Sequence, residues 1–141
     1  GYLTQAFFQQ IFNTMPENLM LVIAYKETQA IASALFVYDQ NQLCGRYWGA
    51  LQDVPSLHFE CCYYQGIEFC IEQDIGVFNP GTQGEHKILR GFEPIYCYSN
   101  HSLKELAFHE AVARFVDQEK KQIQAYKDNA SSLLPFRKAD S

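Results

Sequence analysis

The feature that most constrains the fold is a series of three apolar runs of strand length. They extend from Leu19 to Tyr25, from Ala30 to Tyr38 and from Leu43 to Trp48. Only short polar turns, residues 26–29 and 39–42, separate them. Runs of this length joined by such turns are typical of hairpin-connected strands. The sequence therefore predicts a three-stranded antiparallel meander.

The flanking segments predict alternating helices and strands. Apolar residues at helical spacing predict a first helix over residues 2–13. Beyond the meander, the patterns predict further elements in this order: a strand over 57–61, a helix from 63 to 75, a strand over 76–80, a helix over 83–91, a strand over 94–98, and a long helix opened by an S-x-x-E capping box at Ser102–Glu105. This order predicts an α/β fold of α+β type, with one mixed, mostly antiparallel sheet and helices on both faces.

Length and composition indicate one globular domain. The chain has 141 residues, of which 48% are hydrophobic, enough to bury a core. We expect a single domain over residues 1–126 and a polar, frayed tail over 127–141. Because the chain starts with glycine and opens directly in an amphipathic segment, we also expect it to be part of a longer protein.

Charge and cysteine usage argue against several classes of function. The net charge of −5 disfavours broad binding of DNA or anionic membranes, which requires a basic face. Five cysteines, with no C-x-x-C spacing, favour reduced thiols in a cytoplasmic protein. No apolar run approaches the roughly 20 residues of a membrane span. We therefore expect a cytoplasmic protein without a membrane span.

His58 and Glu60 form the first candidate site. On the predicted strand over 57–61 they are two residues apart, so their side chains would share a face. An amine must lose a proton to attack an acyl carbon, and either group can accept it. The alternative is that both are polar residues satisfied by hydrogen bonds within the sheet. A metal site of His58, Glu60 and His86 is conceivable, but nothing in the spacing demands it, and we expect no metal.

The second candidate site follows Gly84, at the predicted start of a helix. Lys87 and Arg90, with free helix amides, could hold a phosphate or carboxylate. His86 is the better proton carrier of the two histidines, because its unperturbed pKa is near neutrality. The alternative is an exposed first turn, in which Glu85 only complements the helix dipole.

The meander and the predicted sixth strand add further candidates. Alternation on the third strand places Arg46 and Trp48 on one face, where Arg46 could clamp an anionic group and Trp48 line a cleft or the core. Ser99 and His101 end the predicted strand over 94–98, although Ser99 could merely cap a turn. No G-x-S-x-G elbow is present, so a serine-hydrolase triad is not supported.

Four ordered blocks of residues resemble the FemAB-like family of predicted N-acyltransferases, described broadly as peptidoglycan biosynthesis or recognition proteins. The blocks are residues 45–49, 57–60 with 62–68, 81–87 with 90–94, and Ser99 with His101. The similarity extends over about residues 2–120. It implies an acyl-CoA N-acyltransferase (GNAT) fold, in which this chain is the C-terminal of two tandem domains and its N-terminal domain is missing.

The resemblance also bears on the donor. Acetyltransferases of this superfamily carry a Q/R-x-x-G-x-G/A loop that binds the CoA pyrophosphate through backbone amides. At the matching position this chain reads Glu60 to Gly66, with a single glycine. Acyl-CoA is therefore one candidate donor, and aminoacyl-tRNA, which FemAB-type enzymes use, is the alternative.

The sequence and the resemblance together lead to one expected function and two alternatives. We expect an N-acyltransferase domain that moves an acyl or aminoacyl group to an amine of a small molecule or peptide, with peptidoglycan metabolism as its candidate setting and a homodimer as its candidate assembly. His58 or Glu60 would be the base, and His86 would shuttle protons. The expected substrate-binding residues are Arg46, Trp48, Tyr64, Gln83, Gly84, Glu85, Lys87, Arg90, Ser99 and His101. The alternatives are a non-catalytic recognition domain for a peptide or cell-wall precursor, and a structural half of a two-domain transferase.

Overall fold

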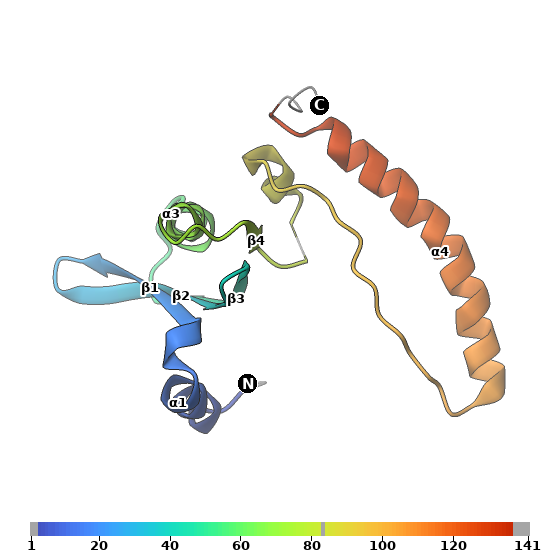
Figure 1. Cartoon of the computed structure of the whole chain (residues 1–141), viewed down its shortest axis with the longest axis horizontal. Coiled ribbons are helices and arrows are strands. Elements are labelled where there is room, and N and C mark those ends of the chain that lie inside the picture. The colour runs from blue at the N-terminus through green and yellow to red at the C-terminus, as the bar shows by residue number, and fades with distance from the viewer. Residues whose placement is uncertain (1–2, 83, 137–141) are drawn as a thin grey trace. The chain divides into compact units, whose positions relative to one another are not determined.

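The computed structural model describes residues 3–82 and 84–136. The chain divides into two units, Gly1–Thr82 and Gln83–Ser141. In Figure 1 the first runs from blue to green, and the second from yellow to red. The first unit contains the sheet, and the second contains a long helix.

The sheet of the first unit has four strands in the order β1-β2-β3-β4. They are β1 (Leu19–Lys26), β2 (Gln29–Tyr38), β3 (Gln42–Ala50) and β4 (Val77–Asn79). The first three are antiparallel neighbours, and β4 runs parallel to β3. The predicted meander and the short strand over 76–80 are therefore confirmed, as is a mixed sheet that is mostly antiparallel.

The turns of the meander are shorter than predicted, because the strands continue into them. Asp39 shows how one turn closes: its Oδ1 accepts the backbone N–H of Asn41 at 2.8 Å and of Gln42 at 2.9 Å. These two hydrogen bonds lower the pKa of the Asp39 carboxyl. A short Asx turn is thus enough to join β2 to β3.

The first predicted helix is confirmed as α1 (Gln5–Thr14), which Thr4 caps by accepting the N–H of Phe7. It is followed by the 3-10 turn η1 (Pro16–Asn18). The ring of Phe8 meets that of Tyr47 edge to face, with centroids 5.8 Å apart. Tyr47 pairs with Leu35, whereas Trp48 pairs with Ala34 of the buried cluster, so α1 packs on the sheet face opposite the main core (Figure 1).

The predicted strand over 57–61 is wrong. Residues 57–72 form one helical run, made of α2 (Leu57–Phe59), the π-helix η2 (Glu60–Tyr64) and α3 (Gln65–Glu72). Cys61, Tyr63, Gly66 and Cys70 are buried along it. The interval of five residues between Cys61 and Gly66 is wider than an α-helical turn, and a π-helical turn accommodates it. The burial of one side of this segment against the sheet therefore favours a helix over a strand with alternating side chains.

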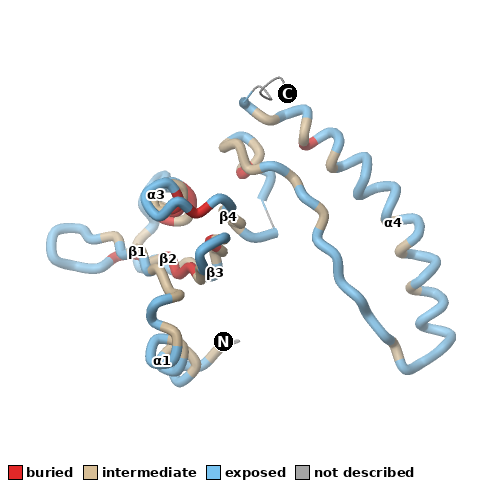
Figure 2. The backbone as a smooth tube through the Cα atoms, viewed as in Figure 1, coloured by how far each residue is buried: buried red, intermediate tan, exposed pale blue. Residues whose placement is uncertain are grey.

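The helical run covers the core face of the sheet. Phe36 and Leu43 are fully buried, in one cluster with Ala34, Cys61, Cys70 and Ile75. Figure 2 shows this burial concentrated on β2 and along α3. Two ring contacts reinforce it: Phe36 with Phe78, centroids 6.0 Å apart, and Tyr38 with Phe69, 5.0 Å apart. Helices thus lie on both faces of the sheet, as predicted.

The second unit begins with the 3-10 helix η3 (Glu85–Arg90) and ends in α4 (Leu106–Ser132). Both predicted helices are confirmed, but residues 92–103 form neither the predicted strand over 94–98 nor any other regular element. Instead, side chains join this segment to α4: the Tyr96 hydroxyl donates to Gln124 Oε1, and Lys127 Nζ lies 4.1 Å from the centroid of the Tyr96 ring. Pro94 cannot donate to a strand ladder, which disfavours a strand here.

The ends of α4 also differ from the prediction. The N-cap is Glu105, whose side chain makes no capping hydrogen bond, so Ser102 does not open the helix. The helix continues to Ser132, and the segment expected to be a frayed tail after residue 126 is helical up to that point. Ala130, near the C-terminal end, is buried, which explains why the helix persists there. No helix in the described part of the chain is long and apolar enough to cross a membrane.

Candidate functional site

A pocket of about 240 Å³ lies in the first unit, where β3 ends and the helical run begins. Trp48 comes from β3, Gln52 and Asp53 from the connecting loop, and His58 from α2; alanine, leucine and valine side chains complete the wall. Two predicted site residues, Trp48 and His58, therefore meet at one pocket. Loops that follow the strands of a rigid sheet are frequent positions for functional side chains.

Aromatic rings hold His58 in place. Its imidazole centroid lies 5.4 Å from the Trp48 ring, 5.4 Å from Tyr63 and 5.5 Å from Phe59, each in edge-to-face geometry. Tyr63 is buried at 4% exposure. Contacts of this kind restrict the orientation of the imidazole while one side of it lines the pocket. The half-buried His58 is therefore positioned to act on a group bound there.

Glu60 does not share a face with His58. Both residues are helical, and two helical positions differ by about 200° around the axis, so the side chains diverge. The exposed Glu60 carboxylate accepts a hydrogen bond from Gln65 Nε2 at 2.9 Å, and Glu60 does not line the pocket. The predicted pairing of His58 and Glu60 depended on a strand that does not form, and it is wrong.

Arg46 lies at an irregularity in β3. Gly45 pairs with Phe36 and Tyr47 with Leu35, which makes Arg46 the extra residue of a β-bulge. Its guanidinium carbon lies 5.5 Å from the centroid of the Tyr47 ring. The bulge removes the simple alternation on which the predicted common face of Arg46 and Trp48 depended. Arg46 does not line the pocket.

The sequence reasoning missed Asp53 and Gln52 as pocket residues. No helix or strand is predicted over residues 49–56, and the segment that follows them is predicted as a strand rather than a helix. A signal was nevertheless present: an acidic and an amide side chain follow directly after a strand rich in aromatic residues. Tyr64, predicted to bind substrate, ends η2 with 48% exposure and lies outside the lining of this pocket.

In the second unit, η3 brings together His86, Lys87 and Arg90. Arg90 Nη1 donates a hydrogen bond of 2.8 Å to the His86 carbonyl oxygen, and Lys87 is buried at 9% exposure. Burial lowers the pKa of His86 first, and the positive charges of Arg90 and Lys87 lower it further. Two cations beside an imidazole kept neutral form an electropositive cluster that can hold a carboxylate or phosphate.

The remaining predicted residues of this unit have separate positions. Gly84 has φ +108°, and a Cβ there would overlap the His86 ring, so glycine lets that ring approach the backbone. Glu85 is exposed in the first turn of η3. Ser99 Oγ and His101 Nε2 are hydrogen-bonded at 2.9 Å in the irregular segment. Gln83 lies outside the described residues.

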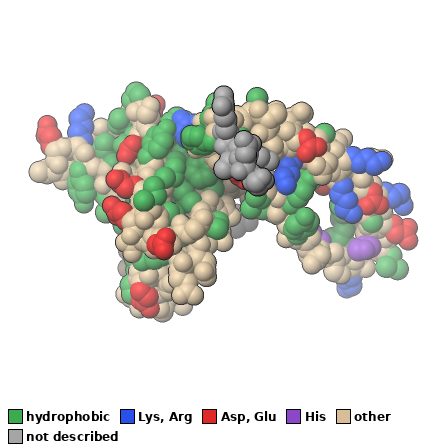
Figure 3. Space-filling model, turned by 45° about the horizontal axis from the view of Figure 1, so that its top comes forward, with side chains coloured by type: hydrophobic (Ala, Val, Ile, Leu, Met, Phe, Trp, Pro, Cys, Tyr) green, Lys and Arg blue, Asp and Glu red, His purple; other side chains and the backbone are tan. Residues whose placement is uncertain are grey.

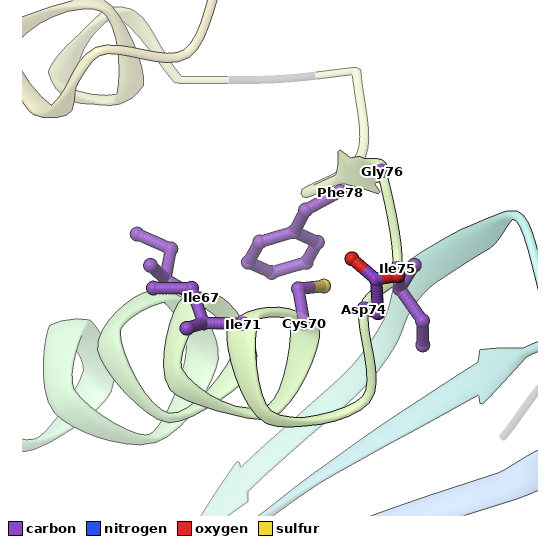
Figure 4. Close-up of a pocket in the computed structure, with 7 residues that line it drawn as sticks. All are labelled: Ile67, Cys70, Ile71, Asp74, Ile75, Gly76 and Phe78. Atoms are coloured by element: carbon purple, nitrogen blue, oxygen red, sulfur yellow. The ribbon is translucent and has the colours of Figure 1, made fainter.

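A second pocket of the first unit, about 410 Å³, lies between the end of α3 and β4. In Figure 4 the Phe78 ring lies over Cys70, and Ile67 and Ile71 of α3 stand to one side. Burial raises the pKa of the Cys70 thiol, so it stays protonated. Asp74 is the one charged residue in the lining. None of the site residues predicted from the sequence lines this pocket.

His58 and Glu60 belong to the first unit and His86 to the second, and each unit is described by itself. Over residues 3–82 and 84–136, no group of three His, Cys, Asp or Glu side chains is arranged to hold a metal ion.

The model of the FemAB-like family, described as peptidoglycan biosynthesis/recognition, matches residues 1–138. No curated protein and no solved structure matches the chain.

Proposed function

Because the chain belongs to the FemAB-like family of peptidoglycan biosynthesis and recognition, we propose that it is an N-acyltransferase domain with a GNAT-like fold. It transfers an acyl or aminoacyl group to an amine of peptidoglycan or of a peptidoglycan precursor. The observation that supports this proposal best is the position of His58, held by aromatic rings at the wall of a pocket beside the sheet.

His58 is the proposed base. As the amine nitrogen attacks the carbonyl carbon of the donor, its proton passes to the imidazole. The new C–N bond forms, the C–S or C–O bond to the donor breaks, and the leaving group takes up a proton. The aromatic contacts of His58 fix the direction from which the proton is removed. Glu60 has no part in this step, because it points away from the pocket.

The electropositive cluster of η3 supplies the second proposed role. Lys87 and Arg90 hold an anionic part of the donor or acceptor, and the neutral imidazole of His86 relays a proton. The residues at which a CoA pyrophosphate loop was expected, Glu60–Gly66, are helical. The loop that does join β3 to the helical run contains Asp53 and no glycine. We therefore propose both acyl-CoA and aminoacyl-tRNA as donors to be compared directly.

Recognition without catalysis is the second candidate function. The observation that favours it is the loss of the predicted His58–Glu60 pair, which leaves His58 as the only imidazole at a small pocket. In that case the pocket binds part of a cell-wall peptide, and the same ring contacts serve specificity alone.

The test measures transfer of a labelled group from acetyl-CoA, and in parallel from aminoacyl-tRNA, to a purified peptidoglycan precursor with a free amine. The protein used is the purified, intact chain. We expect His58→Gln to reduce kcat by about 10²–10⁴-fold, the usual contribution of a general base. The matched control is His109→Gln, at an exposed position on α4, which should leave kcat unchanged. Precursor binding with no transfer from either donor would reject the transferase and select recognition.

A further inference from the structure

The pocket beside β3 has an unusual charge environment. Asp53 is the one residue with a formal charge at neutral pH among those that line it. No lysine or arginine occurs between Tyr47 and Thr82, whereas five acidic residues do. Figure 3 shows acidic side chains spread over the visible face of this unit. A carboxylate in the lining, with no lysine or arginine beside it there, attracts cations and repels phosphate groups.

The neutral walls of the pocket favour a cation as well. Trp48 lines it with the aromatic ring type that attracts cations best, and the His58 ring stands 5.4 Å from it at an interplanar angle of 72°. Leucine and valine side chains complete the wall and suit a short aliphatic chain. A carboxylate, an indole and an aliphatic wall together match an ammonium group carried on an alkyl tether.

We propose that this pocket binds the primary ammonium group of the acceptor, with the Asp53 carboxylate as its counter-ion and the Trp48 ring as its second contact. The proposal rests on the proposed transferase function, and it names the acceptor as a cationic alkylamine. Asp53 is a specificity residue that binds the ammonium form. His58 accepts one proton from the ammonium group, which frees the nitrogen lone pair for attack, and the proton lost as the C–N bond forms leaves with the leaving group of the donor. An anionic donor is then excluded from this pocket.

The test uses the fluorescence of Trp48, which is the single tryptophan of the chain and therefore reports on this pocket directly. The probe is n-butylammonium, titrated at low ionic strength into the protein at neutral pH. Neutral n-butanol and anionic butyrate, of the same chain length, are the comparison ligands. We expect saturable change of Trp48 emission with n-butylammonium alone, weakened by added salt as screening reduces the attraction.

Asp53→Asn keeps the size of the side chain and removes its charge. We expect it to raise the dissociation constant of n-butylammonium at least tenfold. Asp74→Asn is the matched control, because Asp74 lines the other pocket of the same unit, and it should have no effect. Circular dichroism of both variants checks that the fold is retained. Equal binding of butyrate or n-butanol, or an unchanged affinity in Asp53→Asn, would overturn the proposal.

The two proposals fail in different ways. If the protein binds n-butylammonium through Asp53 but transfers no acyl group, the ammonium site stands and the transferase fails. If it transfers acyl groups and Asp53→Asn leaves KM for the amine unchanged, the transferase stands and the ammonium site is rejected. A higher KM with an unchanged kcat in Asp53→Asn is the kinetic result that supports both.

Discussion

At the scale of single residues, His58 shows how neighbours define a candidate base. Rings from β3, α2 and η2 surround it, and it lines the pocket together with Asp53. The sequence identified His58 and Trp48 from their types. It assigned Glu60 an equal role, because only the backbone conformation decides whether two residues two positions apart point the same way.

The electrostatics of His86 give a prediction at this scale. Burial, then Arg90, then Lys87 lower the pKa of its imidazole, so its NMR titration should have a midpoint below the ordinary value of 6.5. Arg90→Gln should raise that midpoint by removing a like charge. Lys104→Gln, which removes an exposed cation from the same unit, should leave it in place. The His86→Gln variant identifies the His86 resonance. A midpoint that is unchanged in Arg90→Gln would contradict the proposed electrostatic effect of Arg90 on His86.

The same lowered pKa has a consequence for stability. A histidine with a depressed pKa in the folded state binds fewer protons there than in the unfolded chain, so stability rises with pH between the two values. The contribution of His86 is therefore present above about pH 6.5 and is lost as the pH falls through its folded pKa. Denaturant unfolding of His86→Gln should show a flatter pH dependence across that window than the parent. An identical dependence would mean that His86 does not titrate in this way.

At the scale of elements, the contact of α3 with β4 depends on one glycine. Gly66 is buried in α3, and a Cβ there would lie 2.6 Å from Phe78 Cζ and 3.4 Å from Leu43 Cδ2. Gly66→Ala should therefore lower the free energy of unfolding by about 1–2 kcal/mol, because overpacking outweighs the gain of about 1 kcal/mol in helix propensity. Denaturant unfolding of the intact chain measures this change.

Two further variants make the Gly66 test specific. At Gly76 a Cβ would meet nothing within 4 Å, so Gly76→Ala should change stability little. Adding Phe78→Leu to Gly66→Ala removes the opposing ring, and the two changes should be less destabilising together than their sum. Additive effects would show that the Phe78 ring is not what limits this position.

The element scale also shows where sequence periodicity is insufficient. The meander, α1 and α4 follow from hydrophobic runs and helical spacing. The helical run over 57–72 is predicted as a strand followed by a helix, because apolar residues recur every four positions only from Tyr63 to Ile75. The buried residues of the run are instead Cys61, Tyr63, Gly66 and Cys70. A π-helical turn restores a common buried face, and packing against the sheet is what makes this rare element favourable.

At the scale of the whole molecule, charge is unevenly distributed. Residues 1–82 hold eight acidic and two basic residues, a net charge of −6, whereas residues 83–141 hold eight acidic and nine basic ones, a net charge of +1. The overall value of −5 thus conceals an acidic first unit and a nearly balanced second one. An anionic donor is accordingly expected to depend on Lys87 and Arg90, and a cationic acceptor on the first unit.

Thermal melting with and without millimolar acetyl-CoA tests the donor for the whole protein. A ligand present at 100 times its dissociation constant stabilises the folded state by about 2.7 kcal/mol, which raises Tm by several degrees. If acetyl-CoA is a donor, Lys87→Met should abolish that rise, and Lys104→Gln should preserve it. No rise in the parent would reject acetyl-CoA as the donor and leave aminoacyl-tRNA or recognition without transfer, and a rise that survives Lys87→Met would reject the proposed anion site.

The sequence by itself determined the meander, the first and last helices, the acidic balance and the family, because these depend on local periodicity, composition and ordered blocks of residues. It could not determine on which side of its strand or helix each site residue lies. The bulge at Arg46, the π-helix after His58 and the pocket formed with Asp53 arise only when the helical run packs on the sheet. Packing gains free energy by burying side chains against residues that are distant in the sequence, and a local sequence pattern does not contain this contribution.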